Sequence, residues 1–410
     1  MISFEKYVLD NGLRVILHQD TSSPMAVVNV AYDVGSRDEE EERTGFAHLF
    51  EHLMFGGSAN IPDFDGPIQM AGGENNAFTN SDMTNFYNIL PAQNIETALW
   101  LESDRMMKLD FSPKSLATQQ KVVIEEFKET CLNQPYGDMW HHLSGMAYQQ
   151  HSYKWPTIGL VPEHIEHAKL EDVEAFFYRY YRPNNAVLVV AGNIEIDDIK
   201  AQIEKYFAQI PAGVTLSRSL PTEPKQTEIR CKTVEAHVPL PSLIMAYNMC
   251  DRLNDDYYAI DLLSDILANG RSSRFFANIY KQSICSTIDA FISGTFDPGL
   301  FIVEARPMPG TSIDQARDVI WKELEDVKQN GVLEEELEKI RNKTESALVY
   351  SEVTVLHKAM NLAYYEILGD ANMINIQSEK YQKVTLADIQ RVANEILSPS
   401  QCNEIIYVPK

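Results

Sequence analysis

The chain has 410 residues, 44% hydrophobic and 23% charged, which is typical of a folded protein of two or three domains and excludes a disordered one. Its 35 Lys and Arg residues stand against 59 Asp and Glu residues, so the formal net charge is −24. An acidic surface repels a phosphate backbone, and no apolar run approaches the ~18 residues that span a membrane. We therefore expect neither a nucleic-acid partner nor a membrane span.

The amino-terminal residues and the cysteines indicate a cytoplasmic location. The first residues show neither the basic stretch and apolar core of a secretory signal nor the Arg-rich helix of a transit peptide. The five cysteines are scattered and lack CxxC spacing, so they predict reduced thiols and not disulfides or a zinc ribbon. The expectation of a cytoplasmic protein holds provided that Met1 is the native start.

The first segments predict a β-hairpin and a further strand. Two apolar runs, 8–9 and 13–17, flank a turn in which Asn11 and Gly12 tolerate the positive φ of a tight hairpin. The β-branched run Met25–Tyr32 has the length and composition of a strand.

The following segments change between helical and extended patterns. We expect helices over 46–55 and 95–104, a strand over 78–90, and a helix over 115–149 that breaks near 133–137. Helices and strands mix without the regular rhythm of parallel βαβ units. The sequence therefore predicts an α+β fold, with mostly antiparallel sheets packed against helices.

Matching segments recur at nearly one spacing and predict an internal duplication. Segment 170–173 returns at 386–389, and Pro183 returns at Pro399 at the same spacing (386 minus 170, 399 minus 183). A third pair of matches, near the start of each half, has almost the same spacing. Chance similarity of amphipathic segments is the alternative explanation.

The duplication predicts two homologous halves of similar size. A stretch rich in Pro, Gly and Ser over 212–225 has the composition of a linker. We therefore expect an amino-terminal half over 1–211 and a carboxy-terminal half over 226–410, each an α+β domain.

The pentapeptide His48-Leu49-Phe50-Glu51-His52 predicts a metal site. On a helix, residues four apart share a face, so both imidazoles point at one ion. Neutral imidazoles suit Zn²⁺, and a nearby carboxylate that is not a ligand takes a proton from water. The pattern inverts the usual zinc-protease motif. It predicts one zinc ion per chain, with His48 and His52 as ligands and Glu51 as general base.

The third ligand is expected on a later amphipathic helix that carries several carboxylates. Periodicity alone does not choose between Glu125, Glu126 and Glu129. We favour Glu126, because it lies four residues after Val122 and shares the buried face of that helix.

A competing interpretation makes the two histidines ordinary core residues, because the same helix carries several large apolar side chains. The internal repeat argues against it. When Gly56 is aligned with Gly270, Leu262 stands opposite His48 and Ile266 opposite His52. Buried polar groups are costly, so the histidines have a task that the aliphatic copy lacks.

Four features of the chain form one pattern: the zinc motif, the glutamates downstream, the duplicated halves and the sequence Gly-Gly-Glu-Asn-Asn-Ala-Phe-Thr at 72–79. This pattern resembles the pitrilysin and mitochondrial-processing-peptidase family of zinc metallopeptidases. The resemblance covers nearly the whole chain. It implies that His48 and His52 bind zinc, that Glu51 is the base and that Glu126 is the third ligand.

The same resemblance implies that Asn76, Ala77 and Phe78 lie on an edge strand beside the metal. An exposed edge offers backbone groups to an extended peptide, which docks as an added strand. An ordinary glycine-rich turn entering a buried strand is the alternative for this segment.

The chain departs from the family pattern at two places. Seven residues before the third ligand the family commonly has a supporting glutamate, and here Gln119 orients its neighbours without a negative charge. In the second half, active relatives carry an Arg and a Tyr that clamp the substrate carbonyl, and those positions fall on Ser283 and Thr287. The missing pair implies a homologous partner subunit that supplies it in a heterodimer. A homodimer, in which the pair stays missing, is the alternative assembly.

The sequence thus predicts a zinc endopeptidase that cleaves short or unfolded peptides inside a chamber formed by paired subunits. A non-catalytic structural or assembly subunit of a peptidase-like complex is the alternative. His141, His142 and His151 are further candidates for metal contact, although a solvated helix face explains them more simply.

Overall fold

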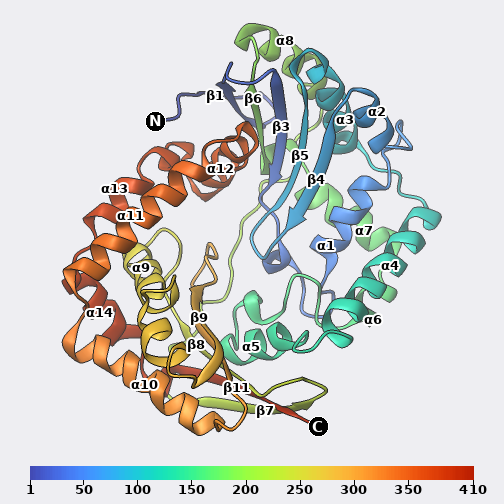
Figure 1. Cartoon of the computed structure of the whole chain (residues 1–410). Coiled ribbons are helices and arrows are strands. Elements are labelled where there is room, and N and C mark those ends of the chain that lie inside the picture. Colours follow the sequence, from blue (N-terminus) through green and yellow to red (C-terminus); the bar gives the residue numbers. More distant parts are fainter. The chain divides into compact units, whose positions relative to one another are not determined.

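The computed structural model describes all residues, 1–410, and the chain folds into two compact units (Figure 1). The first unit consists of residues 1–128, 155–221 and 349–375. The second unit consists of residues 129–154, 222–348 and 376–410. Each unit contains one sheet, so the sheets and cores are described separately.

The first unit is built on a six-stranded sheet whose strands follow the order β1-β2-β6-β3-β5-β4. Strands β2 and β6 are parallel, and every other neighbouring pair is antiparallel. The central strands are buried, whereas β4 pairs on one side only and is an edge. In sheet order the strands are β1 (Glu5–Val8), β2 (Arg14–Gln19), β6 (Ala186–Gly192), β3 (Met25–Tyr32), β5 (Thr84–Pro91) and β4 (Glu74–Thr79).

Helices of the first unit cover this sheet, and all of them except α12 bury apolar residues in one core. Helix α1 contributes Phe46, Leu49, Phe50 and Leu53 to that core, at the spacing of one helix face. The helices are α1 (Phe46–Phe55), α2 (Asp65–Met70), α3 (Ile95–Met107), α4 (Pro113–Phe127), α6 (Pro162–Glu166), α7 (Leu170–Tyr180), α8 (Ile196–Phe207) and α12 (Val355–Leu368).

The second unit has a five-stranded sheet of order β7-β11-β8-β10-β9, in which only β7 and β11 are parallel. Its strands are β7 (Arg230–Ala236), β11 (Cys402–Pro409), β8 (Ser242–Asn248), β10 (Leu300–Pro307) and β9 (Cys285–Ile292). Its helices are α5 (Met139–Ala147), α9 (Asp256–Ala268), α10 (Ile313–Asn330), α11 (Glu334–Ser351), α13 (Gln377–Lys383) and α14 (Leu386–Ile396). Short turns join the elements, among them η1 (Ser36–Asp38), η3 (Lys128–Leu132) and η6 (Phe276–Tyr280).

Equivalent elements recur along the chain at one spacing, which confirms the predicted duplication. Three pairs of equivalent elements begin the same number of residues apart. They are β5 and β10 (300 minus 84), α7 and α14 (386 minus 170), and α5 and α12 (355 minus 139). Each sheet also has its one parallel pair at the equivalent place. The predicted α+β class with mostly antiparallel sheets is confirmed.

The two halves exchange one helix. Helix α5, from the first half of the chain, packs on β8 and β11, and α12, from the second half, packs on β3 and β6. No helix or strand lies between the end of α8 at Phe207 and the start of β7 at Arg230. The boundaries proposed from sequence, 1–211, 212–225 and 226–410, stay a prediction.

Most of the expected elements are found where the sequence places them, and one predicted strand is wrong. The first hairpin, with Gly12 at a φ of 87°, strand β3 and helices α1 and α3 are confirmed, as is the break before α5. The single strand expected over 78–90 is two strands, β4 and β5. They are separated by a turn in which Asn80 Oδ1 accepts from the amides of Asp82 at 2.8 Å and Met83 at 2.9 Å. This local side-chain bond ends the extended run.

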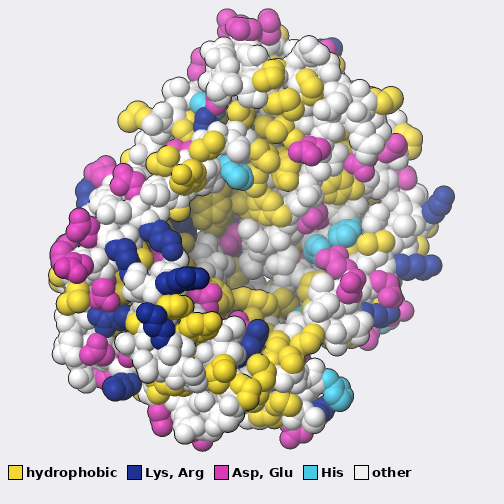
Figure 2. Space-filling model, in the orientation of Figure 1, with side chains coloured by type: hydrophobic (Ala, Val, Ile, Leu, Met, Phe, Trp, Pro, Cys, Tyr) yellow, Lys and Arg dark blue, Asp and Glu magenta, His cyan; other side chains and the backbone are white.

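None of the helices combines the length and the apolarity that crossing a membrane demands. Acidic side chains are spread over the face in Figure 2, in keeping with the net charge of −24. Lys and Arg side chains instead gather over α9 and α11 of the second unit.

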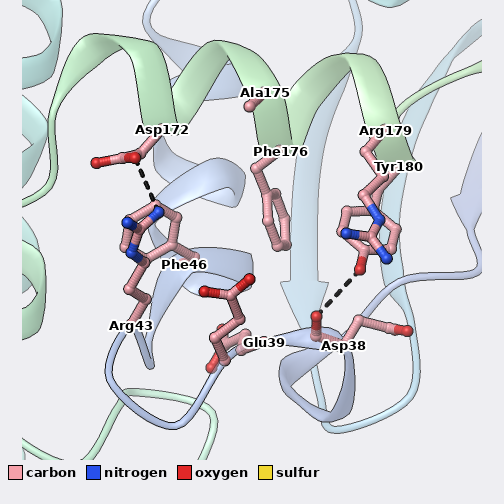
Figure 3. Close-up of a pocket in the computed structure, with 10 residues that line it drawn as sticks. Asp38, Glu39, Arg43, Phe46, Asp172, Ala175, Phe176, Arg179 and Tyr180 are labelled. Carbon is pink, nitrogen blue, oxygen red and sulfur yellow. Dashed lines mark hydrogen bonds and ion pairs between the residues drawn. The ribbon is translucent and has the colours of Figure 1, made fainter.

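The amino terminus of α1 is anchored by a buried carboxyl group. Helix α1 begins after Gly45, at a φ of 86°, and has no side-chain cap at that position. The carboxyl group of Glu39 takes this role, because Oε2 accepts from the Gly45 amide at 2.9 Å and Oε1 from the Ala47 amide at 2.8 Å. Glu39 lies below Phe46 among the residues in Figure 3. Burial raises the pKa of Glu39 well above its usual range.

We predict that Glu39→Gln destabilises the chain most at low pH. The amide nitrogen cannot accept a backbone N–H, so the loss near pH 5 is about 1–2 kcal/mol. Since the folded-state pKa is raised, the protonated carboxyl stabilises the fold below its unfolded pKa, and that contribution is lost as the pH rises. The wild-type advantage in unfolding free energy therefore shrinks between pH 5 and pH 8, as measured by urea denaturation.

The exposed Glu42 supplies the matched control. Glu42→Gln leaves the unfolding free energy unchanged at both pH values. A wild-type advantage over Glu39→Gln that grows with pH would show that Glu39 is ionised in the fold and contradict this assignment.

Candidate metal centre

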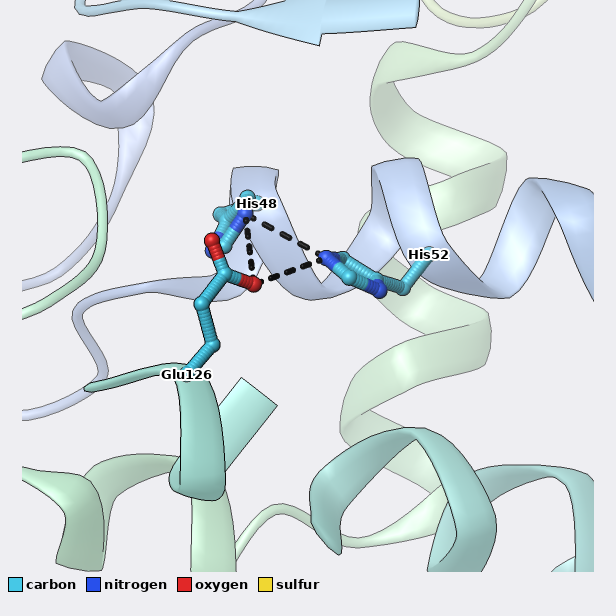
Figure 4. Close-up of side chains that lie close together, drawn as sticks. All are labelled: His48, His52 and Glu126. Carbon is cyan, nitrogen blue, oxygen red and sulfur yellow. Dashed lines mark hydrogen bonds and ion pairs between the residues drawn. The ribbon is translucent and has the colours of Figure 1, made fainter. Parts of the chain in front are cut away.

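The two histidines of α1 lie on one side of the helix, away from the face that enters the core. Their Nε2 atoms are 3.3 Å apart, as expected for residues separated by one turn (Figure 4). The rings meet edge to face, with centroids 4.8 Å apart. Both imidazoles therefore direct the same nitrogen toward one point.

Helix α4 packs against α1 and brings a carboxylate to that point. The Oε2 atom of Glu126 lies 3.7 Å from Nε2 of His48 and 3.3 Å from Nε2 of His52. The two alternatives left open by the sequence point elsewhere. Glu125 bonds to Lys128 at 2.7 Å, with 71% of its side chain exposed, and Glu129 lies beyond the end of α4 in η3.

The spacing of these three atoms fits a tetrahedral zinc ion. Ligand atoms bound at about 2.0–2.1 Å in a tetrahedron stand about 3.3–3.4 Å from one another. The measured separations are 3.3, 3.3 and 3.7 Å. No other group of three His, Cys, Asp or Glu side chains brings its ligand atoms within 4.8 Å of one another. The donor set, two imidazoles and one carboxylate, is also one that zinc accepts.

The protonation states of the three groups favour a cation. Burial lowers the pKa of His48, against the opposing effect of Glu126, so the imidazole is held neutral. The hydrogen bond with His52 lowers the pKa of Glu126, which keeps that carboxylate ionised. Neutral imidazole and ionised carboxylate are the forms that bind a metal.

The support behind the ligands is sparse. Nδ1 of His48 is buried without a hydrogen-bond partner, although metal-binding histidines usually donate this hydrogen to a neighbour. Gln119 lies near the carboxyl end of α1, where its Nε2 is 3.8 Å from the point at which a Cβ on Gly56 would stand. It is thus placed one turn beyond His52 along α1.

Glu51 is held by a residue to which the sequence analysis gave no role. The hydroxyl of Thr79, the last residue of β4, donates to Glu51 Oε2 at 2.6 Å. This bond joins α1 to the edge strand and fixes the orientation of the carboxylate. The only sequence signal for it was that Thr79 ends the phrase at 72–79.

The predicted peptide-binding residues Asn76, Ala77 and Phe78 all lie on β4, which is the edge of the first sheet. The amide of Ala77 donates to the side-chain Oδ1 of Asn76 at 2.8 Å, so this N–H points away from β5. An outward N–H at an edge is the group that an added strand needs. Strand β4 also packs against α1, which carries the histidines.

The second unit lacks the donors that the family pattern places there. Ser283 lies in the turn before β9, at a φ of 55°, and Thr287 lies in β9. Arg306 stands opposite Thr287 in the neighbouring strand, but it bonds to Glu304 at 2.8 Å and stacks on the ring of Tyr136. Its charge is already compensated within the second unit.

The other candidate histidines do not join the metal group. His142 bonds to Asp138 at 3.0 Å and to Lys232 at 2.8 Å, and His151 lies 3.5 Å from Asp297. His141 is likewise in the second unit, on α5. These histidines therefore belong to the second unit and not to the metal group on α1 and α4.

Two family models match the chain. Residues 14–159 match the model described as Insulinase (Peptidase family M16), and residues 167–344 match the model described as Peptidase M16 inactive domain. The first match contains the histidine pair and the second contains its aliphatic copy, Leu262 and Ile266.

Curated relatives and solved structures agree with these models. Zinc protease PqqE of Helicobacter pylori is 26% identical over 414 residues, covering 99% of this chain and 93% of that protein. A probable mitochondrial-processing peptidase subunit beta of Arabidopsis thaliana is 24% identical over 310 residues, covering 72% of this chain and 58% of that protein. The crystal structure of a protease from Helicobacter pylori superposes with a TM-score of 0.93 at 26% identity, with both chains covered completely. The chain therefore belongs to peptidase family M16, the insulinase family of zinc proteases, as its sequence motifs predict.

Proposed function

We propose that this chain is a zinc-dependent endopeptidase that cleaves short or unfolded peptides. The observation that carries the proposal is the convergence of His48, His52 and Glu126 at tetrahedral spacing, beside a fourth group, Glu51, that no cation partner neutralises. One zinc ion per chain is the cofactor we assign. The family match and the zinc-protease relatives support the assignment.

The residues around the site have separate tasks in peptide hydrolysis. A bound zinc ion supplies a Lewis acid that polarises the scissile carbonyl and acidifies water. Glu51 takes the proton of the attacking water and returns it to the leaving amine nitrogen. Since Thr79 occupies Oε2, the Oε1 atom of Glu51 is the one that we assign to proton transfer.

Strand β4 holds the peptide in an extended conformation. A peptide that pairs with β4 replaces Asn76 Oδ1 as the acceptor of the Ala77 N–H. Backbone pairing does not depend on the side chains of the substrate, which suits peptides of varied sequence. It also favours an unfolded substrate, because a segment in a helix or in the interior of a sheet has no free backbone groups along one side.

The chain is proposed to work with a homologous subunit, in a chamber formed by the pair. Ser283 and Thr287 provide neither a cation nor a phenol where the family pattern places Arg and Tyr, and Arg306 is paired with Glu304. Losing such donors to the developing oxyanion typically costs ~10²-fold or more in rate. A different homologous subunit that carries both groups restores them in a heterodimer, whereas a homodimer encloses the chamber without the two donors.

A non-catalytic structural or assembly subunit is the second candidate. The match of residues 167–344 to an inactive-domain model and the missing donor pair favour it. The complete set of His48, Glu51 and His52 favours the peptidase, because a site without turnover has no need of a base next to the metal.

We predict that Glu126→Gln weakens zinc binding more than about 100-fold, since even loss of an outer partner of a ligand costs 10–100-fold. Glu125→Gln is the matched control, because Glu125 is the exposed neighbour that points to Lys128. It is expected to leave the affinity unchanged. Competition with a chelator measures both, and equal affinities for the two variants would remove Glu126 from the ligand set.

We predict that Glu51→Gln retains zinc and loses peptide cleavage by about 10²–10⁴-fold, the range of a general base. The assay uses fluorogenic peptides, with metal content determined in parallel. The chain alone is expected to be weakly active and to gain activity when co-purified with its native partner.

The outcomes of that assay separate the two candidate functions. Cleavage that is equal in wild type and Glu51→Gln, with and without the partner, would establish the non-catalytic alternative. Strong, Glu51-dependent cleavage by the chain as a single homo-oligomeric species would refute the need for a different partner subunit.

We predict that Ala77→Pro lowers kcat/KM about tenfold or more with zinc affinity unchanged, because proline removes the outward N–H without breaking the bonds to β5. Asn76→Ala is the control. It removes the competing acceptor and leaves the N–H, so its kcat/KM should equal or exceed that of the wild type. A normal kcat/KM for Ala77→Pro would exclude strand addition at β4.

A further inference from the structure

Three cations gather around the turn that follows α9 in the second unit. Arg271 lies in the turn itself, and Lys339 and Lys343 reach it from α11. No carboxylate forms an ion pair with any of the three, and Arg271 and Lys343 are exposed. We call these three residues the cationic turn. They belong to the region of the second unit where Lys and Arg side chains gather in Figure 2.

The two lysines are held in place by the turn. Lys343 Nζ donates to the side-chain Oδ1 of Asn269, and Asn269 in turn donates to Asp265 at 2.7 Å. Lys339 Nζ donates to the carbonyl of Ser272 at 3.2 Å and to its hydroxyl at 3.1 Å. The ammonium groups are therefore ordered before any ligand arrives, which reduces the entropy lost on binding.

Glycine at position 270 permits the backbone conformation of this turn. Gly270 has a φ of 94°, a conformation that L side chains rarely adopt. A Cβ at this position would lie 3.6 Å from Lys343 Nζ, an ordinary contact distance, so the conformation of the turn and not the space beside the lysine calls for glycine.

Local structure alone does not account for three unpaired cations. A cation at the carboxyl end of a helix is favourable, but that effect is satisfied by one charge, and three like charges repel one another. Of the nearby carboxylates, Glu336 and Asp326 bond to Arg274 at 2.8 and 2.9 Å. Asp265 accepts from Asn269, so Asp265 acts on Lys343, and Glu336 on Lys339, without forming an ion pair with either. In a chain of net charge −24, the cationic turn is left free to bind an anion.

We infer that the cationic turn binds an acidic segment of the polypeptide substrate. The inference rests on the proposed peptidase function and adds a substrate preference to it. An Arg offers five donors and a Lys three, so Arg271, with none engaged, and Lys343, with one engaged, suit side-chain carboxylates.

The overall charge selects between acidic ligands. Salt screens charges beyond about 8–10 Å, so three local cations can attract a short run of carboxylates despite the acidic surface elsewhere. A nucleic acid carries its negative charges along a much longer backbone, which also meets the rest of the acidic protein surface and is repelled by it. A short acidic stretch of an unfolded polypeptide fits both conditions.

The test measures binding and cleavage separately. Two fluorescent peptides of one sequence, with three consecutive Glu or three consecutive Gln residues, are titrated by anisotropy against the full-length Glu51→Gln chain, which does not cleave them. The Glu peptide is expected to bind about tenfold more tightly at low salt, from three exposed ion pairs, and to lose the advantage at high salt.

Replacing Arg271, Lys339 and Lys343 by Ala together is expected to abolish that advantage. Because the lysines also hold the turn, Arg271→Ala is made alone as well. The Arg271 side chain is exposed and forms no hydrogen bond or ion pair within the chain, so this variant should keep the fold and reduce the advantage severalfold. The control replaces Lys114, Lys225 and Lys410, which are exposed and lie outside the cationic turn, and so changes the net charge equally. This control variant should keep the binding preference for the Glu peptide.

Three results would overturn the inference: no preference for the Glu peptide, a preference that survives loss of the three cations, or equal binding of a single-stranded DNA of matched charge. The proposed peptidase function is judged independently, by cleavage of the Gln peptide by the wild-type chain together with its native partner. Cleavage of the Gln peptide without a binding preference for Glu refutes the cationic turn and leaves the peptidase standing. A charge preference without any cleavage refutes the peptidase and makes the cationic turn a site for an acidic partner that is not a substrate.

Discussion

The structure depends on one electrostatic constraint, the approach of three electron-rich atoms within 3.7 Å of one another. Two neutral imidazole nitrogens and a carboxylate oxygen stay that close only when a proton, as in the hydrogen bond between His52 and Glu126, or a cation lies between them. Helices α1 and α4 hold the three atoms there because the opposite face of α1 is locked in the core and its first turn is bonded to Glu39. The rigidity that the cation requires thus comes from apolar packing and a buried cap.

The parts of this site that follow from helical periodicity could be read from the sequence, and the parts that follow from tertiary contacts could not. Residues four apart on a helix share a face in any fold, so His48 and His52 were predictable as a pair. The reason given for choosing Glu126 was wrong, because Val122 is 45% exposed and does not mark a buried face. Glu126 lies beside the histidines because α4 packs against α1, which is a tertiary contact. Thr79 and Glu39 were missed because their contacts, with Glu51 and with Gly45 and Ala47, arise where separate segments meet. The prediction of one strand over 78–90 was wrong for a similar reason, since Asn80 Oδ1 accepts a hydrogen bond from the Met83 amide and this turn ends the strand.

The duplication shows how one scaffold carries two kinds of surface. Helix α9 repeats α1 with Leu262 and Ile266 in place of the histidines, and both are buried. At the carboxyl end of the helix the neighbours of the equivalent glycine also differ. Gly56 lies beside the neutral side chains of Ser115 and Gln119, whereas Gly270 lies beside the ammonium group of Lys343. The second copy has aliphatic side chains in place of the two histidines and a lysine beside its glycine, and the turn itself also differs, because Gly56 has a φ of −72° and Gly270 a φ of 94°.

The exchange of helices makes the first unit dependent on the second half of the chain. Helix α12 covers β3 and β6 and is fastened by polar contacts, in which Lys358 bonds to Asp20 at 2.6 Å and Glu366 accepts from Lys6 at 3.0 Å. Without α12 the buried residues of these central strands would face water, at roughly 25 cal/mol for each Å² of apolar surface. Strand β3 also pairs with β5, and β5 pairs with the edge strand β4 that holds Glu51 through Thr79. The metal centre therefore cannot be separated from a helix encoded in the other half, so the aliphatic copy is retained for folding even where it has no ligands of its own.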